Sequence, residues 1–243
     1  MEKLGNPERF LNAYSIIEHE MERILNLKDH RRFFELVDKS ARLNPVIDQY
    51  RFDLKEFSEL RNAIVHDRIN GEIIAIPTDA AVESIERIAA LLLQPPTVAP
   101  IFLKEVLVLQ ASDPVEKAVR ELSRHSYTQV PVIKEGRMLG LLTSNMIVKW
   151  MGSSIDDDSF SLDRVSLLEV IKAAGHEKNY HLVSVQHSLL EIPDLFYKWQ
   201  QQGKKLEAVL ISETGDAGEK FLGIITNRDL PAIYKEIGNN SEK

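Results

Sequence analysis

The most constraining feature of this sequence is a short pattern that occurs twice in the C-terminal two thirds of the chain. Residues 140–146 read GLLTSNM, and residues 223–229 read GIITNRD. In each copy a short apolar run, typical of a buried strand, ends in a threonine that is suited to cap a following helix. Two copies of one strand-to-helix corner indicate an internal repeat, and the repeat sets the architecture of this region.

The elements expected around the two corners follow one order: strand, helix, strand, strand, helix. A cap at 112–114 and the spacing of apolar residues place the elements of the first repeat at 105–109, 115–122, 129–133, 139–143 and 147–151. The same reasoning places those of the second repeat at 180–185, 189–201, 206–211, 221–226 and from there to 237. Residues 134–137 (KEGR) predict a hairpin turn between two of the strands.

This order of elements, with its Gly-hydrophobic-hydrophobic-Thr-x-x-Asp corner, resembles the CBS domain. Two copies in tandem resemble a CBS pair, and the resemblance extends from about residue 101 to the end of the sequence. It implies a regulatory site for an adenine nucleotide (AMP, ADP or ATP) in the clefts between the two repeats.

In the second repeat the resemblance assigns a role to each residue of the corner. Thr226 matches the hydroxyl that meets ribose or phosphate, and Asp229 matches the carboxylate that holds the ribose diol. Asn227 and Arg228 lie between them, within reach of phosphate. The edges that would line the adenine, partly through backbone hydrogen bonds, are Leu182, Val183, Glu207, Ala208 and Val209. The alternative is that Thr226 and Asp229 only cap a helix.

The first repeat departs from this pattern. Thr143 matches the hydroxyl, but Met146 stands where the acid is expected, and a thioether cannot accept two ribose hydroxyls. We therefore expect this site to be weak or empty unless Asn145 replaces the acid. Tyr127 and Pro131 are assigned to the same site and are suited to stack on a base.

The N-terminal third has a different pattern, with apolar residues at helical spacing. It predicts helices at about 7–26, 29–43, 45–68 and 78–94, and short connections between them favour an antiparallel four-helix bundle. Residues 94–100 (QPPTVAP) are expected to end the last helix and to form a linker that does not re-enter a helix. The fold class is therefore α+β, a helical bundle followed by a tandem CBS pair.

The third helix carries Arg61, Asn62 and His66. At 100° per residue Asn62 and His66 share the face opposite the apolar stripe, and the long side chain of Arg61 can reach the imidazole. A solvated helix face explains this spacing equally well. The pattern nevertheless resembles the Arg-x4-His motif of the HEPN superfamily, four-helix bundles that include metal-independent RNases acting as dimers.

By this resemblance, His66 is a general base or a transition-state contact, and Arg61 stabilises the charge on the phosphorane. Asn62 matches the polar residue that often follows the arginine. Arg68 stands where some toxin members of the superfamily carry a tyrosine, and many members are not catalytic.

Composition narrows the alternatives further. The 243 residues include no cysteine, so disulfides and thiolate sites are excluded, and a net charge of −7 argues against broad nucleic-acid binding. The histidines show no metal-ligand spacing, and neither a P-loop nor a Gly-x-Ser-x-Gly motif occurs. We expect no membrane segment, a cytoplasmic protein and no tightly bound metal. The acidic run 156–158 is read as a solvated loop, with a magnesium site as the alternative.

The expected organisation is a helical bundle, a linker, a first repeat, a connector, a second repeat and a tail, at 1–94, 95–100, 101–151, 152–179, 180–238 and 239–243. Two functions remain open. In the first, the CBS pair binds an adenine nucleotide and modulates a HEPN-like dimer that acts on RNA. In the second, the protein is a non-catalytic dimerisation or scaffold protein whose CBS pair binds a nucleotide weakly or not at all.

Overall fold

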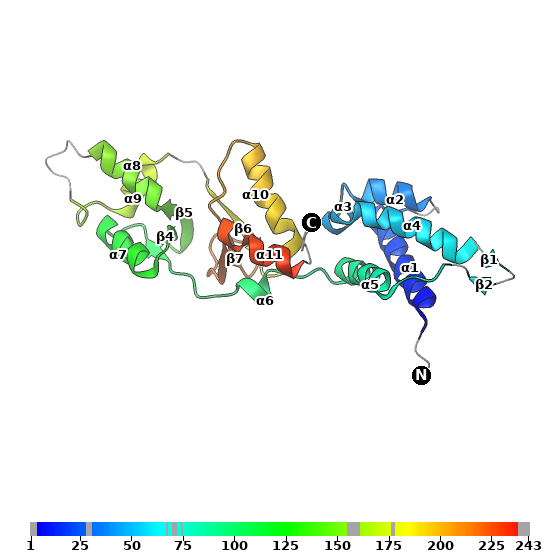
Figure 1. The fold of residues 1–243 in the computed structure, drawn as a ribbon. Coiled ribbons are helices and arrows are strands. Elements are labelled where there is room, and N and C mark those ends of the chain that lie inside the picture. Colours follow the sequence, from blue (N-terminus) through cyan, green and yellow to red (C-terminus); the bar gives the residue numbers. More distant parts are fainter. Residues whose placement is uncertain are drawn as a thin grey trace. The chain divides into compact units, whose positions relative to one another are not determined.

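The fold is α+β, as the sequence predicts, and the chain divides into two compact units, Met1–Pro96 and Thr97–Lys243. A computed structural model describes residues 4–27, 31–66, 68–69, 72–73, 75–154, 161–175 and 178–237. Figure 1 shows the helical first unit, in blue to green, and the mixed helix and strand structure of the second. Among the described residues no helix combines the length and the apolar character needed to cross a bilayer.

The first unit is built from helices with a short antiparallel hairpin. Its elements are α1 (Asn6–Ile24), α2 (Phe33–Ser40), α3 (Pro45–Gln49), α4 (Arg51–His66), β1 (Arg68–Ile69), β2 (Glu72–Ile73) and α5 (Asp79–Leu93). The stripes predicted from the spacing of apolar residues meet in one core, which contains Phe10, Ile17, Met21, Leu36, Leu54, Ile64, Ile85 and Ile88. Thr78 caps α5, because its hydroxyl accepts a hydrogen bond from the Ala81 amide.

The helix expected over 45–68 is in fact two helices. Asn44 caps α3 by accepting hydrogen bonds from two backbone amides. The chain then leaves the helical conformation at Tyr50, whose side chain is buried and whose ring faces the guanidinium of Arg87 at 5.8 Å. Buried apolar residues occur on both sides of the break, Val46 and Ile47 on α3 and Leu54 and Ile64 on α4, so the sequence pattern does not reveal it.

The second unit contains two copies of one arrangement. The first comprises β3 (Leu109–Gln110), α7 (Val115–His125), β4 (Gln129–Lys134), β5 (Arg137–Thr143) and α8 (Ser144–Ser154). The second comprises β6 (Tyr180–Ser184), the turn η1 (Leu189–Glu191), α10 (Ile192–Gln201), β7 (Ala208–Ser212), β8 (Gly223–Ile225), the turn η2 (Asn227–Asp229) and α11 (Leu230–Glu236). Each three-stranded sheet has its strands in sequence order, with the first pair parallel and the second antiparallel. The internal repeat is therefore confirmed.

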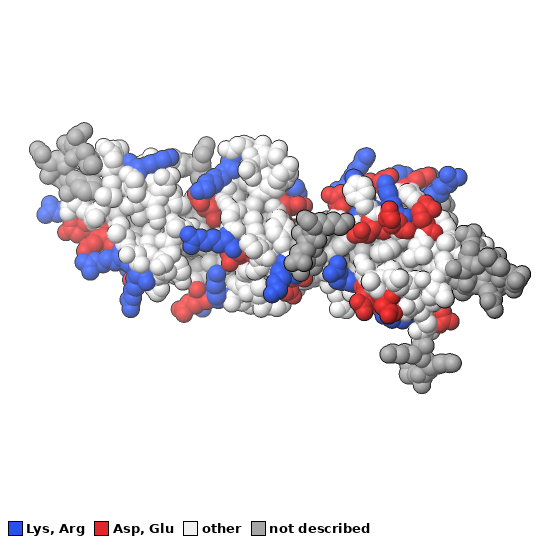
Figure 2. Space-filling view, in the orientation of Figure 1, with Lys and Arg blue, Asp and Glu red and all other residues white. Residues whose placement is uncertain are grey.

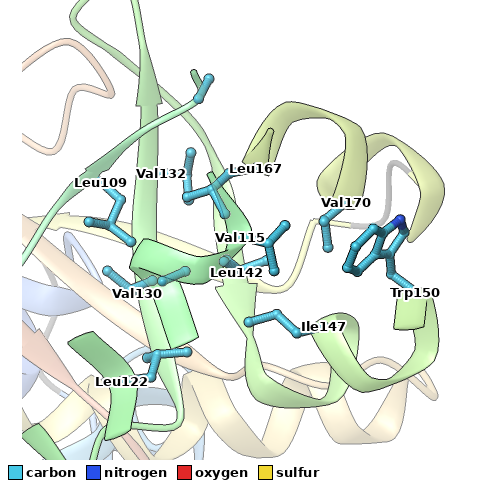
Figure 3. Packing of buried hydrophobic residues seen from close by; sticks show 12 residues of the cluster. Leu109, Val115, Leu122, Val130, Val132, Leu142, Ile147, Trp150, Leu167 and Val170 are labelled. Atoms are coloured by element: carbon cyan, nitrogen blue, oxygen red, sulfur yellow. The ribbon is translucent and has the colours of Figure 1, made fainter. Parts of the chain in front are cut away.

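The connector between the repeats contributes a helix to the core of the first repeat. Figure 3 shows the apolar side chains of β3, β4 and β5 packed against α7 and α8, with Leu167 and Val170 of α9 (Leu167–Ala173) in the same cluster. Both of these side chains are fully buried. The acidic run 156–158 lies outside the described residues.

A second apolar cluster joins the two repeats. Met138 and Leu141 of β5 pack with Leu210 of β7 and with Phe221. A backbone hydrogen bond adds to this contact, since the Met138 amide of β5 donates to the Ala217 carbonyl of the β7–β8 loop at 2.8 Å.

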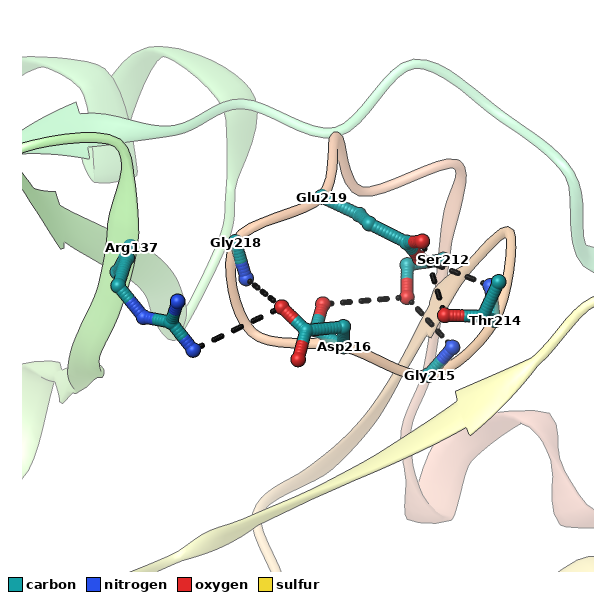
Figure 4. A network of polar contacts seen from close by, with 7 residues as sticks. All are labelled: Arg137, Ser212, Thr214, Gly215, Asp216, Gly218 and Glu219. Carbon is teal, nitrogen blue, oxygen red and sulfur yellow. Dashed lines mark hydrogen bonds and ion pairs between the residues drawn. The ribbon is translucent and has the colours of Figure 1, made fainter.

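The loop between β7 and β8 is itself ordered by side chains (Figure 4). Glu219 accepts hydrogen bonds from the amide and the hydroxyl of Thr214, which lower the pKa of its carboxyl group. Asp216 accepts from the Gly218 amide and lies 3.7 Å from the guanidinium of Arg137 in the first repeat. The loop is therefore fixed both internally and against the other repeat.

The linker differs from the expectation at two points. A short helix, α6 (Ala99–Phe102), forms despite Pro100, because a proline in the first turn of a helix removes no hydrogen bond. The strand expected at 105–109 shrinks to β3. The residues before β3 pass from one sheet to the other. Leu103 pairs with Gly223 of the second repeat, whereas Leu109 pairs with β4 of the first.

Candidate functional site

The candidate site is a cavity of about 330 Å³ that both repeats of the second unit line. The first repeat supplies residues 104–107, 126–129 and Pro131, and the second supplies Lys205, Glu207, Ile224 and residues 226–229. The cavity therefore gathers the corner 223–229 and segments that lie about a hundred residues away in the sequence.

The corner of the second repeat enters this cavity as a capping box. One carboxylate oxygen of Asp229, Oδ2, accepts from the amide of Thr226 at 2.7 Å and from its hydroxyl at 3.0 Å. The same hydroxyl accepts from the Arg228 amide at 3.3 Å. Among the described residues, Oδ1 of Asp229 has no hydrogen-bond partner. The two residues thus cap the helix and still leave one acceptor oxygen for a ligand.

Tyr127 is the aromatic residue of this cavity. Ser126 ends α7 in the left-handed conformation, with φ 55°, and this turn brings Tyr127 and Thr128 to the cavity wall. Tyr127 is 48% exposed, and its ring stacks on the His125 ring, with centroids 5.2 Å apart. The structure therefore places Tyr127 with Thr226, whereas the sequence reasoning grouped it with Thr143. Pro131 lies on the same wall.

Charges of both signs surround the cavity. Lys205 is paired with Glu207, with 2.9 Å between Nζ and Oε1. Within the described part of the chain, Lys104 and Arg228 make no ion pair with a carboxylate, so both cations are available to an anionic group. On the face of the molecule shown in Figure 2, acidic and basic side chains are interspersed over each unit.

Several residues suggested by the sequence do not line this cavity. Val183, Ala208 and Val209 are buried within the sheet of the second repeat, where their backbones pair with neighbouring strands. Thr143 is buried, and its hydroxyl accepts from the Met146 amide at 3.2 Å. Asn145 is exposed on the first turn of α8 and lies apart from the cavity wall.

The sequence analysis did not assign six polar residues of the wall to the site: Lys104, Glu105, Ser126, Thr128, Gln129 and Lys205. Lys104 and Glu105 stand directly before the apolar run 106–109; Lys104 was placed in the first repeat without a role, and Glu105 at the start of a strand. Gln129, whose side-chain amide donates to the Glu207 carbonyl at 3.3 Å, was read as part of a strand. A polar residue at the end of an otherwise apolar strand was the available signal.

In the first unit, the three residues singled out on the third helix are in contact. Arg61 Nη1 lies 3.3 Å from Nε2 of His66 and 3.3 Å from Oδ1 of Asn62. A guanidinium can only donate, so Nε2 of His66 is the acceptor in this contact. Arg61 also faces the ring of Tyr14 at 5.9 Å, and burial raises the pKa of Tyr14 to about 12.

No group of three or more His, Asp or Glu side chains within the described ranges is placed to hold a metal ion.

Comparison with known proteins finds a family match over the first repeat. The family model of the CBS domain matches residues 98–153. A search of curated proteins finds no match. The repeated order of elements and this match together support a tandem CBS fold for the second unit.

Solved structures with a similar fold include three proteins of low sequence identity. A hypothetical conserved protein from Geobacillus kaustophilus is 19% identical, with a TM-score of 0.45, and the match covers 59% of this chain and 98% of that one. A putative acetoin utilization protein from Vibrio cholerae is 17% identical, with a TM-score of 0.44 and coverage of 62% and 100%. CbpB in complex with c-di-AMP is 12% identical, with a TM-score of 0.46 and coverage of 65% and 95%.

Proposed function

We propose that the second unit is a regulatory module that binds one adenine nucleotide in the cavity formed by both repeats. The observation that carries this proposal is that Thr226, Asp229 and Tyr127 line one cavity together with unpaired cationic side chains. Its volume of about 330 Å³ lies at the lower end of the range typical of small-molecule sites, about 300–1,000 Å³.

Each part of a nucleotide has a chemically matched group on this wall. The Tyr127 ring and Pro131 offer a surface on which a base can stack. Oδ1 of Asp229 accepts hydrogen bonds from ribose hydroxyls, while Oδ2 keeps the helix cap. Lys104 and Arg228 neutralise phosphate. Lys104 belongs to the segment that leads from the linker into this unit. A phosphate bound to Lys104 would therefore stabilise one position of that segment. We propose that this is how the ligand modulates the helical unit.

A calorimetric titration of the full chain with AMP, ADP, ATP and adenosine tests the proposal, with c-di-AMP included for comparison. We expect AMP, ADP or ATP to bind more tightly than adenosine. We expect Asp229→Asn to weaken nucleotide binding at least tenfold. Asn can still accept from the Thr226 amide, so this variant should keep most of the cap. Asn145→Ala is the matched control, because Asn145 occupies the corresponding corner of the first repeat and lies off the wall. Absence of heat with every nucleotide at millimolar concentration would refute the proposal.

We further propose that the first unit acts on RNA as a homodimer, with Arg61 and His66 at the reaction centre. The contact between Arg61 and Nε2 of His66 favours this function, since it holds a guanidinium and an imidazole side by side on an exposed helix face. In such a site Nε2 of His66 exchanges its contact with Arg61 for the ribose 2′-hydroxyl and accepts its proton. The 2′-oxygen attacks the adjacent phosphorus to form a 2′,3′-cyclic phosphate, and the 5′-oxygen leaves as a hydroxyl after it takes a proton from the imidazolium. Arg61 stabilises the charge of the phosphorane, and Asn62 positions Arg61.

A labelled RNA incubated with the purified protein tests this function. We expect the wild type to cut it and His66→Ala to leave it whole, while His19→Ala, which changes an exposed histidine on α1, retains cleavage. Equal cleavage by the wild type and by His66→Ala would exclude catalysis at this site. If neither protein cuts RNA but light scattering still shows a dimer, the helical unit is a dimerisation or scaffold module.

A further inference from the structure

The first repeat has a cavity of its own, of about 270 Å³, beside the corner that carries Met146 in place of an acid. Strand β5, helices α8 and α9 and the residues that lead into β6 enclose it. Most of its wall is apolar, and the partly buried side chains on it are Leu139, Met146, Leu168 and Ile171. These side chains retain surface that a bound apolar group would remove from water.

The chemistry of this wall differs from that of the first cavity. The thioether of Met146 cannot replace a carboxylate as an acceptor for ribose hydroxyls. The Thr143 hydroxyl is directed to the Met146 amide, and neither Thr143 nor Asn145 lies on the wall. Helix α9 lies against this wall, since a Cβ on Gly140 would be 3.4 Å from Cγ2 of Ile171, an ordinary contact distance. The wall is therefore suited to an apolar body and not to a sugar.

The charged groups on this wall have one sign. Lys172 and Lys178 line the cavity, and no acidic residue does so in the described part of the chain. The Lys178 ammonium lies 5.1 Å from the centre of the Tyr180 ring, which is also on the wall. Neither lysine forms an ion pair with a described carboxylate. In a chain of net charge −7, two unpaired cations beside an apolar cavity indicate an anionic partner group.

We infer that this cavity binds a small amphipathic carboxylate, a straight-chain fatty acid of medium length. The hydrocarbon chain contacts Met146, Leu168 and Ile171, and the carboxylate lies at Lys172 and Lys178. Because α9 lies within the connector, the ligand would bind where the connector meets the first repeat. The site therefore offers a second input that is chemically separate from the nucleotide cavity.

Calorimetry on the full chain with hexanoate, octanoate and decanoate tests this inference, and octanol and octylamine serve as matched probes. We expect octanoate to bind at least tenfold more tightly than either matched probe. The double variant Lys172→Gln/Lys178→Gln should lose that preference. Lys149→Gln, an exposed change on α8 away from the wall, should retain it. Both substitutions alter exposed side chains, so loss of folding, checked by circular dichroism, is not expected.

A second variant tests the apolar part of the site. Gly140→Val should fill the space near Ile171 and abolish octanoate binding, and its nuclear magnetic resonance spectrum reports whether the fold is kept. Asp229→Asn should leave octanoate binding unchanged, which separates this inference from the nucleotide proposal. The inference would be overturned if none of the three carboxylates bound at millimolar concentration. It would also be overturned if octanoate and octanol bound equally well and the lysine substitutions changed neither affinity.

Discussion

The carbonyl oxygen of Phe102 lies so close to Gly223 that a Cβ atom on this glycine would be 2.2 Å from it. The chain that enters the second unit therefore passes directly over the first residue of β8. Lys104, two residues further on, donates its amide to the Leu222 carbonyl at 2.8 Å, and its side chain lines the cavity. Thr226 follows Gly223 by three residues. The short strand β8 therefore contacts the incoming segment at its first residue and leads directly into the Thr226–Asp229 cap at its end.

Replacing Gly223 by alanine should displace the linker from β8. The added methyl group would meet backbone at a distance that real Cβ atoms do not reach, so we expect a loss of about 1–3 kcal/mol in the free energy of unfolding. Urea denaturation measures it. Gly140→Ala is the matched control, since its Cβ would lie 3.4 Å from the nearest atom, an ordinary contact, and should change stability little. Equal stability of the two variants would contradict the close approach.

Removal of the Thr226 hydroxyl should weaken the start of the last helix. Thr226→Ala loses the acceptor for the Arg228 amide and the donor to Asp229, and a lost cap of this kind costs about 0.5–2 kcal/mol. Thr226→Ser keeps the hydroxyl and should retain most of the stability. Thermal unfolding without ligand separates this structural role from nucleotide binding. A Thr226→Ala protein as stable as the wild type would show that the capping box contributes nothing.

The buried pair Tyr14 and Ser58 should contribute to the stability of the helical unit. The Tyr14 hydroxyl lies 3.3 Å from Oγ of Ser58, which is only 4% exposed. Tyr14→Phe removes this partner, and we expect a loss of about 1 kcal/mol. Tyr197→Phe, at a side chain that is 60% exposed, serves as the control and should be neutral in the same denaturation experiment. A neutral Tyr14→Phe would mean that Ser58 finds another partner.

The ion pair between α1 and α5 should make stability depend on pH. Arg9 donates two hydrogen bonds to Glu86, at 2.9 and 2.6 Å, and these bonds lower the pKa of the Glu86 carboxyl group from its ordinary value of 4.5. A lowered pKa in the folded state stabilises the protein above the ordinary value, and the contribution disappears as the pH falls through the folded pKa.

We therefore expect Glu86→Gln to melt at a lower temperature than the wild type at neutral pH. The difference should shrink as the pH falls below 4.5. It should be small, because both side chains are more than a third exposed and water screens the pair. A difference in melting temperature that is constant from neutral pH to about pH 3 would rule out this ion pair as the cause.

The sequence alone determined the features that depend on local pattern. Apolar spacing predicted α1, α5, α7 and α10, because a helix needs only a stripe that repeats along its own length. The repeated corner predicted two sheets with one strand order, and comparison of the copies showed that Met146 replaces an acid in the first. Contact between Arg61 and His66 was also foreseeable, since residues five apart on one helix are within reach of an arginine side chain.

Only the tertiary structure decided which segments meet at each cavity. Packing of the two sheets brought Tyr127 to Thr226, carried Lys104 to the same wall and set α9 beside Met146. At the break between α3 and α4, the ring of Tyr50 likewise meets a residue distant in the sequence, the guanidinium of Arg87. These contacts join residues far apart in the sequence, and their energies depend on the shapes of both partners. No periodicity within one segment encodes them, so they become visible only when the chain has folded.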